Sequence, residues 1–194
     1  AKEKGLEPLA EWLLLYKKEN PAEKAMEFVN AEKEVASAED ALQGAQDIIA
    51  ELVSDNAAYR SWIRNTTFRK GIMSSSVKDK EKDEKNIYEM YYGYEEPLQK
   101  VVPHRVLAMN RGEKEDVLRV SVITPIEEIL QFLHKKMILD EASKSAHYVQ
   151  LAMEDGYKRL IQPSIEREIR KELMETAEEQ AIHIFSENLR NLLL

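Results

Sequence analysis

Apolar residues recur every three or four positions from Ile165 almost to the end of the chain, with glutamate and arginine between them. This spacing places the apolar side chains on one face of an α-helix. The residues of that face are Ile165, Ile169, Leu173, Thr176, Ile182, Phe185, Leu189 and Leu192. Because the spacing departs from a strict seven-residue repeat after Thr176, we expect this helix to pack against neighbouring domains rather than form a free coiled coil.

Three helix starts are marked by capping residues. Asn20-Pro21-Ala22-Glu23 and Thr124-Pro125-Ile126-Glu127 each combine a capping residue, a proline and a glutamate, and Ser37 with Asp40 forms a capping box. The helix after Ser37 has its apolar residues on one face, namely Ala41, Leu42, Ala45, Ile48, Ile49, Leu52 and Val53. These patterns predict core helices.

Residues Val117 to Ile123 alternate between apolar and polar side chains and are rich in valine, which predicts a β-strand. Ile72 to Val77 alternates weakly and is the expected partner, since a strand alone is unstable. A helix from about Ser143 should reach Gln162-Pro163, where the proline either starts a new helix or kinks a long one. We therefore predict a mainly α, multi-helix assembly with one small two-stranded β element and long C-terminal helices.

The predicted elements suggest three regions. Residues 1–29 form N-terminal helices that dock on the remainder, residues 30–139 form a compact helical unit with the small β element, and residues 140–194 form extended helices leading into a following domain. With 194 residues, 43% of them hydrophobic, the chain can bury one sizeable core or two small ones.

The composition also bounds the compartment and the partners. No cysteine is present, which excludes a disulfide framework and a thiolate metal site and suits a reducing compartment. No apolar run reaches the roughly 20 residues that span a bilayer, so we expect a cytoplasmic protein without membrane contacts. The formal net charge of −8 repels polyanions on average, so any nucleic-acid contact must be local.

The stretch from Tyr59 to Lys70 is basic and aromatic and contains no acidic residue. On a helix, Arg60 and Arg64 lie one turn apart and could both reach a phosphate backbone, while Trp62 could stack on a base. Arg69 and Lys70 complete this first basic group. The alternative is that the aromatic residues belong to the core and that the arginines pair with acidic residues elsewhere in the chain.

A second basic group follows farther along the chain, diluted by acidic residues. Its members are His104, Arg105, Arg111, Lys114 and Arg119. We include Arg105, Arg111 and Lys114 among the candidate nucleic-acid-binding residues, although Arg111-Gly112 most simply ends a helix and the nearby acids make local pairs. The run Lys78 to Lys85 has mixed charges and no apolar residue, which is typical of a solvated loop.

Four tyrosines gather between the two predicted strands, at positions Tyr88, Tyr91, Tyr92 and Tyr94. Aromatic side chains can stack bases, but Glu89, Glu95 and Glu96 beside them would repel phosphates. We therefore expect the tyrosines to pack under a loop or to form a protein-interface patch.

The sequence offers no arrangement typical of catalysis. The four histidines lie singly, none within a His-Glu-x-x-His motif, and neither a Gly-x-x-x-x-Gly-Lys loop nor a Gly-x-Ser-x-Gly elbow is present. We expect no metal site, no cofactor and no enzymatic activity.

Three strings resemble the bacterial transcription accessory protein Tex family. They are Ala-Glu-Lys-Glu-Val-Ala-Ser-Ala-Glu-Asp-Ala-Leu-Gln-Gly-Ala-Gln-Asp-Ile-Ile-Ala-Glu at 31–51, Pro-His-Arg-Val-Leu-Ala-Met-Asn-Arg-Gly-Glu-Lys-Glu at 103–115, and Phe-Ser-Glu-Asn-Leu-Arg-Asn-Leu-Leu at 185–193. In this family the last string leads into an RNase H-like (YqgF-type) domain. The resemblance implies an internal piece, because the family's helix-hairpin-helix and OB-fold RNA-binding domains have no counterpart here.

What the resemblance implies for function is a non-catalytic scaffold that positions RNA- or DNA-binding domains. Its expected partners are nucleic acid, bound through the intact protein, and its own neighbouring domains. The alternative is a protein–protein interaction module that contacts the transcription machinery, including RNA polymerase.

Overall fold

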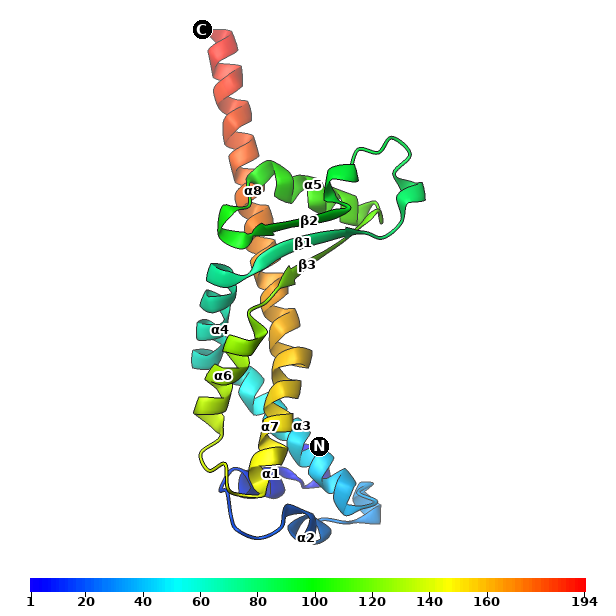
Figure 1. Ribbon diagram of the computed structural model, residues 1–194, viewed down its shortest axis with the longest axis vertical. Helices are drawn as coiled ribbons and strands as arrows, with labels where there is room; N and C mark the ends of the chain where they lie inside the picture. The colour runs from blue at the N-terminus through cyan, green and yellow to red at the C-terminus, as the bar shows by residue number, and fades with distance from the viewer. The chain divides into compact units, whose positions relative to one another are not determined.

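The computed structural model describes all 194 residues, and helices dominate it (Figure 1). The chain forms two compact units. Unit 1 contains residues 1–63 and 126–164, and unit 2 contains residues 64–125 and 165–194. Each unit therefore joins two separate stretches of the chain, and the division into residues 1–29, 30–139 and 140–194 stays a prediction.

Unit 1 is mainly helical, with one isolated β-bridge between Asn30 and Val35. It contains short 3₁₀ turns at Lys2–Lys4 and Ala31–Lys33, the helices α1 (Glu7–Leu13), α2 (Pro21–Met26), α3 (Ala38–Asp55), α6 (Ile126–Met137) and α7 (Ser145–Asp155), and the first part of α4 (Ala57–Lys70). Two predicted caps are confirmed by hydrogen bonds. The side chain of Asn20 accepts from the amide of Ala22 at 3.0 Å, and that of Ser37 accepts from the amide of Asp40 at 3.2 Å.

Helix α3 supplies the centre of the unit 1 core. Its predicted apolar face is buried except for Leu52, whose side chain is 47% exposed. Leu9 and Leu13 of α1 and Val149 of α7 are fully buried in the same unit. Burying a leucine or valine side chain contributes about 1.5–3 kcal/mol to stability, so these contacts account for the packing of short helices that would not persist alone.

Helix α7 continues into a π-helical segment, Gly156–Ile161, which is followed by α8 (Gln162–Leu193). The amide of Gln162 donates to the carbonyl of Tyr157, five residues back. In a regular α-helix the ring of Pro163 would clash with the carbonyl four residues earlier, and the proline has no N–H to donate. The wider π turn precedes this proline, so the helical path continues through Pro163 instead of ending there.

Unit 2 contains a small antiparallel sheet. The elements of unit 2 are the end of α4, β1 (Ile72–Val77), β2 (Gly93–Pro97), α5 (Pro103–Lys114), β3 (Leu118–Ile123), most of α8, and 3₁₀ turns at Lys80–Lys82, Glu89–Tyr91 and Leu98–Lys100. The strand order is β2-β1-β3. The predicted pairing of Ile72–Val77 with the valine-rich strand is confirmed, with Ser75 opposite Val120.

The prediction of a two-stranded element was wrong, because β2 adds a third strand. Its sequence, Gly-Tyr-Glu-Glu-Pro, has no apolar alternation, and it begins with glycine and ends with proline, two residues that disfavour strands. As an edge strand, β2 needs only its backbone to pair with β1. Charged residues and proline are common on such edges, since they discourage pairing with another chain.

Helix α5 packs closely on β3. A Cβ atom added at Gly112 would lie 2.5 Å from Leu118 Cδ1, so a larger residue there would have to displace the buried Leu118 side chain. The expectation that the helix ends at Arg111-Gly112 was wrong, because α5 continues to Lys114. Gly112 serves close packing between helix and strand rather than helix termination.

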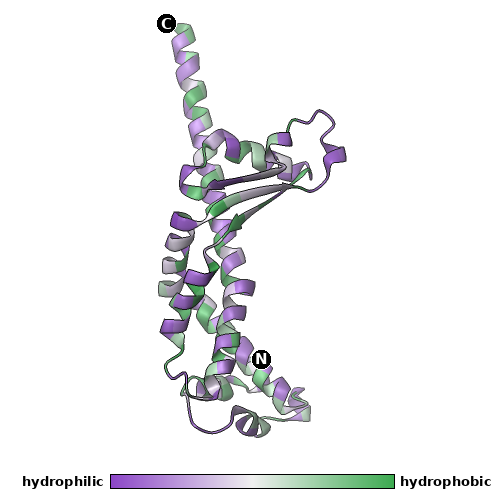
Figure 2. Ribbon diagram, in the orientation of Figure 1, coloured by the Kyte–Doolittle hydropathy of each residue, from purple (hydrophilic) through white to green (hydrophobic).

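The end of α8 carries exposed apolar side chains. Figure 2 shows green, hydrophobic residues interspersed with purple ones along this helix. Ile182 is 67% exposed and Phe185 is 68% exposed, whereas Ile165 and Ile169 are buried. The packing of this face against neighbouring domains stays a prediction. None of the helices is both long enough and apolar enough to cross a membrane.

Candidate nucleic-acid interface

Two residues of the first basic group, Arg60 and Trp62, are engaged within unit 1. Arg60 Nε donates to the carbonyl of Ser54 at 2.6 Å, and its Nη1 donates to Ser164 Oγ at 3.3 Å. The ring of Trp62 stacks on Phe132 with a centroid separation of 3.8 Å and an interplanar angle of 6°. One face of the indole is therefore covered by another aromatic ring, and a base could stack only on the other.

The other three members of this group belong to the end of α4 in unit 2. Arg64 forms ion pairs with Glu168, at 3.6 Å, and with Glu172, both on α8. Arg69 and Lys70 are exposed. Intramolecular partners thus occupy Arg64, as they do Arg60, and a nucleic-acid role for these five residues stays a prediction.

Arg105, from the second basic group, joins α5 to the sheet. Its Nη1 lies 2.9 Å from Glu96 Oε1, and the side chains are 30% and 13% exposed, respectively. Tyr94 Oη donates to the other oxygen of the same carboxylate at 2.9 Å. Burial and the bond to Glu96 raise the pKa of Tyr94. Arg105 therefore has a structural partner on β2.

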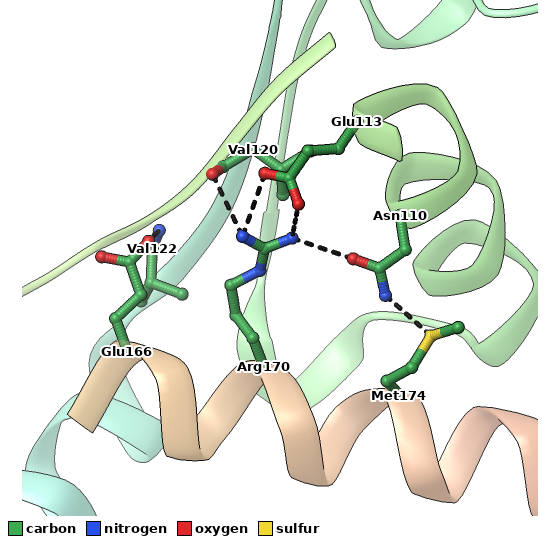
Figure 3. Close-up of polar contacts among 7 residues, drawn as sticks. All are labelled: Asn110, Glu113, Val120, Val122, Glu166, Arg170 and Met174. Carbon is green, nitrogen blue, oxygen red and sulfur yellow. Dashed lines mark hydrogen bonds and ion pairs between the residues drawn. The ribbon is translucent and has the colours of Figure 1, made fainter. Parts of the chain in front are cut away.

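Arg170 of α8 connects this helix to α5 (Figure 3). Its guanidinium forms a two-pronged ion pair with Glu113, at 2.6 and 3.0 Å, and donates to Asn110 Oδ1 at 2.9 Å. Two-pronged arginine–carboxylate pairs fix geometry as well as adding energy. Asn110 and Glu113 belong to the string 103–115 that carries the family resemblance, so part of that string holds the fold together.

The same stretch of α8 covers the free edge of β3. Glu166 Oε1 accepts from the amide of Val122 at 3.0 Å, and the carbonyl of Val120 lies 3.5 Å from Arg170 Nη1 (Figure 3). These backbone groups point away from β1 and would otherwise be an unpaired strand edge. Helix α8 therefore positions both the sheet and α5, and with them the remaining candidate residues.

Those remaining candidates, Arg111 and Lys114, lie at the C-terminal end of α5. The side chain of Arg111 is 73% exposed, and its Nε lies 3.4 Å from Glu115 Oε1. Lys114 is exposed too. Two more cations, Lys78 and Lys82, approach from the loop after β1, and both contact the carboxylate of Asp116. We call Lys78, Lys82, Arg111 and Lys114, with Asp116, the basic pole.

Asp116, which follows α5, contacts the two lysines that follow β1. Lys78 Nζ lies 2.5 Å from one carboxylate oxygen, and Lys82 Nζ lies 2.6 Å from the other. These hydrogen bonds lower the pKa of Asp116 to about 2, and the bond to Asp116 raises the pKa of Lys82. Asp116 has a positive φ of 66°, a region that aspartate tolerates better than most residues.

Lys78 and Lys82 were not among the predicted site residues, because their run was assigned to a solvated loop. Both are about half exposed, so that description fits their solvation but misses their convergence. The feature of the sequence that could have indicated their position was the predicted pairing of Ile72–Val77 with Val117–Ile123. Extending that pairing by one residue joins the amide of Lys78 to the carbonyl of Val117, at 2.7 Å, and places the lysines beside the end of α5.

The tyrosine cluster is mostly buried. Tyr88 and Tyr91 are 4% and 7% exposed, which agrees with packing under a loop. The buried carboxylate of Asp83 accepts from the amides of Ile87 and Tyr88 and from Tyr92 Oη, at 2.7 to 3.0 Å. The last of these bonds raises the pKa of Tyr92 to about 12. These contacts fix a loop from which Ile87 protrudes, 58% exposed.

Fold and site together define a helical region with a small antiparallel sheet and an exposed basic pole. Residues 16–185 match the family model described as Tex central region-like. The chain therefore belongs to this family, the central region of the transcription accessory protein Tex, and its relatives contain it as part of a larger protein.

Three relatives illustrate the match. The uncharacterized protein YdcI of Bacillus subtilis is 56% identical over 196 residues, which cover 100% of this chain and 27% of the relative. Protein tex of Bordetella pertussis is 32% identical over 209 residues, covering 100% of this chain and 26% of the relative. The human S1 RNA-binding domain-containing protein 1 is 27% identical over 208 residues, covering 100% and 20%. The chain thus spans between a fifth and just over a quarter of the length of these relatives.

Proposed function

We propose that this chain is a non-catalytic scaffold region of a Tex-like transcription accessory protein, which positions RNA- or DNA-binding domains and adds phosphate contacts of its own at the basic pole. Membership of the Tex family supports the scaffold part. The name of the human relative, an S1 RNA-binding domain-containing protein, supports nucleic acid as the partner of the longer protein. A cytoplasmic location stays a prediction from the sequence.

The observation that carries the phosphate-binding part is the charge balance at the basic pole. The basic pole has four cations, Lys78, Lys82, Arg111 and Lys114. Asp116 pairs with the first two and Glu115 with Arg111. Two carboxylates thus pair with three of these four cations, on a chain whose net charge is −8. Exposed lysine and arginine side chains near one another bind phosphates by releasing condensed counterions.

Charge reversal at the basic pole tests this proposal. The double substitution Arg111→Glu, Lys114→Glu should weaken binding of a labelled single-stranded oligonucleotide at least tenfold, measured by fluorescence anisotropy. Two lost phosphate contacts should also lower the slope of log K against log salt by about two. The matched control is Lys17→Glu, Lys18→Glu, which makes the same charge change on exposed residues of unit 1.

Equal loss of affinity in the control and at the pole would show that only net charge matters and would contradict the proposal. The same assay with Arg69→Glu examines the exposed arginine of the first basic group. If that substitution alone abolishes binding, the interface lies at the end of α4 and not at the basic pole.

The second candidate function is a protein–protein interaction module that contacts the transcription machinery. The observation in its favour is the pair of exposed apolar residues Ile87 and Met90, 58% and 56% exposed, on the loop that Asp83 fixes. Exposed apolar side chains on a fixed loop are typical of interface anchors. Recovery of RNA polymerase from nuclease-treated extract by the chain, and its loss in Ile87→Ser, Met90→Ser, would support this function over nucleic-acid binding.

A further inference from the structure

Two lysines share one carboxylate at the basic pole. Lys78 and Lys82 each donate to a different oxygen of Asp116, and all three side chains are 46% to 48% exposed. The arrangement consists of two anionic oxygens held between two ammonium groups at an open surface. The two non-bridging oxygens of a phosphodiester carry the same charge and accept the same hydrogen bonds.

We propose that Lys78 and Lys82 form a phosphodiester-binding site, and that Asp116 occupies this site when nucleic acid is absent. The inference rests on the proposed nucleic-acid function and assigns Asp116 the role of an internal competitor. Nucleic acid binds by replacing the carboxylate between the two ammonium groups.

The backbone around Asp116 is fixed, so the exchange requires only rotation of its side chain. The amide of Asp116 donates to the carbonyl of Glu113 at 3.0 Å, and the amide of Val117 donates to that of Gly112 at 2.9 Å. The lysines are presented from fixed backbone too. The amide of Lys78 donates to the carbonyl of Val117, and Lys82 ends a 3₁₀ turn in which the Asp79 side chain accepts from the amide of Glu81.

The exchange is favourable because the pairs that it breaks are weak. Exposed ion pairs gain little, since water and salt screen them. Arg111 and Lys114, on the helix α5 that precedes Asp116, are exposed as well. Asp116 competes as a full negative charge near neutral pH, since its pKa, which its two lysine partners lower to about 2, lies far below that pH.

Removing the competitor should strengthen binding, which is the reverse of what loss of a binding residue does. Asp116→Asn keeps the side-chain shape and tolerates the positive φ, but it frees both lysines. We expect it to bind labelled single-stranded RNA about threefold to tenfold more tightly, the range that two exposed ion pairs allow. The slope of log K against log salt should become steeper by about one to two. Lys78→Met and Lys82→Met should each weaken binding.

The matched control is Glu84→Gln, which removes one negative charge from an exposed residue of the loop that contains Lys82. An equal gain in Glu84→Gln would show that net charge alone is responsible and would overturn the competitor role. Asp116→Asn binding no more tightly than the unchanged chain, while the lysine variants weaken binding, would also overturn it but would leave the proposed function standing. If neither the lysine variants nor Arg111→Glu, Lys114→Glu alters binding, the proposed function fails as well.

Two further arms complete the experiment. DNA of the same sequence as the RNA shows whether the site reads the phosphodiester alone, in which case both are bound equally. If Asp116→Asn does not fold, Asp116→Gly replaces it, because glycine adopts a φ of 66° without strain.

Discussion

Replacing Arg170 by methionine should destabilise unit 2 by about 2 kcal/mol, a value between two limits set by burial. Exposed ion pairs contribute roughly 0–1 kcal/mol, whereas breaking a buried pair costs about 3–5 kcal/mol. Here the side chains of Arg170 and Glu113 are 22% and 38% exposed, so the pair lies between these cases. Methionine preserves the apolar stem and the helix propensity, and removes the bonds to Glu113 and Asn110.

Urea denaturation followed by circular dichroism would measure the free energy of unfolding. A double-mutant cycle with Glu113→Gln should give a coupling energy of about 1–2 kcal/mol, because the two groups are in direct contact. The control is Lys171→Met on the next residue of α8, where the lysine is 77% exposed and 4.0 Å from Glu175. If Arg170→Met costs no more than this control, Arg170 does not hold α8 to α5 and the argument from burial is wrong.

Two further predictions concern unit 1. Gly156→Ala should lower the free energy of unfolding by about 1–3 kcal/mol in urea denaturation, because the added Cβ would lie 2.8 Å from the backbone oxygen of Ala50 in α3. The control is Gly93→Ala in β2, where the added Cβ meets open space and should change little; equal effects of the two substitutions would contradict the prediction. Both ring nitrogens of His134 face acceptors, Gln150 Oε1 at 2.7 Å and Glu141 Oε1 at 2.6 Å, and these bonds raise its pKa. The resulting stabilisation should be complete below about pH 6.5, the ordinary histidine pKa, and be lost as pH rises through the raised value; identical pH profiles for the unchanged chain and His134→Gln would exclude it.

The parts of the fold that the sequence predicted correctly depend on local rules. The caps at Asn20 and Ser37 act over two or three residues, so neighbouring side chains suffice to identify them. The pairing of β1 with β3 followed from the alternation of one strand and the need for a partner. Strand β2 was missed because an edge strand is selected by its backbone and its neighbour, and neither leaves a pattern in Gly-Tyr-Glu-Glu-Pro.

The candidate site was harder to predict, since partners distant in sequence decide which cations stay available. Arg60 bonds to Ser164, 104 positions away, and Arg64 to Glu172, 108 positions away. Nothing in the local string 59–70 identifies these partners. Asp116 lies 38 positions from Lys78, and only the folded sheet brings them together.

The interleaved order of the two units constrains how the protein is made. Residues 1–63 cannot complete their core until residues 126–164 have left the ribosome, and β3 emerges before the stretch of α8 that contains Glu166 and Arg170. Nascent chains therefore pass through a stage with apolar helix faces and a bare strand edge open to aggregation. For the same reason, a truncation after residue 125 removes part of both units, residues 126–164 of unit 1 and residues 165–194 of unit 2, so such a deletion is a poor way to divide their roles.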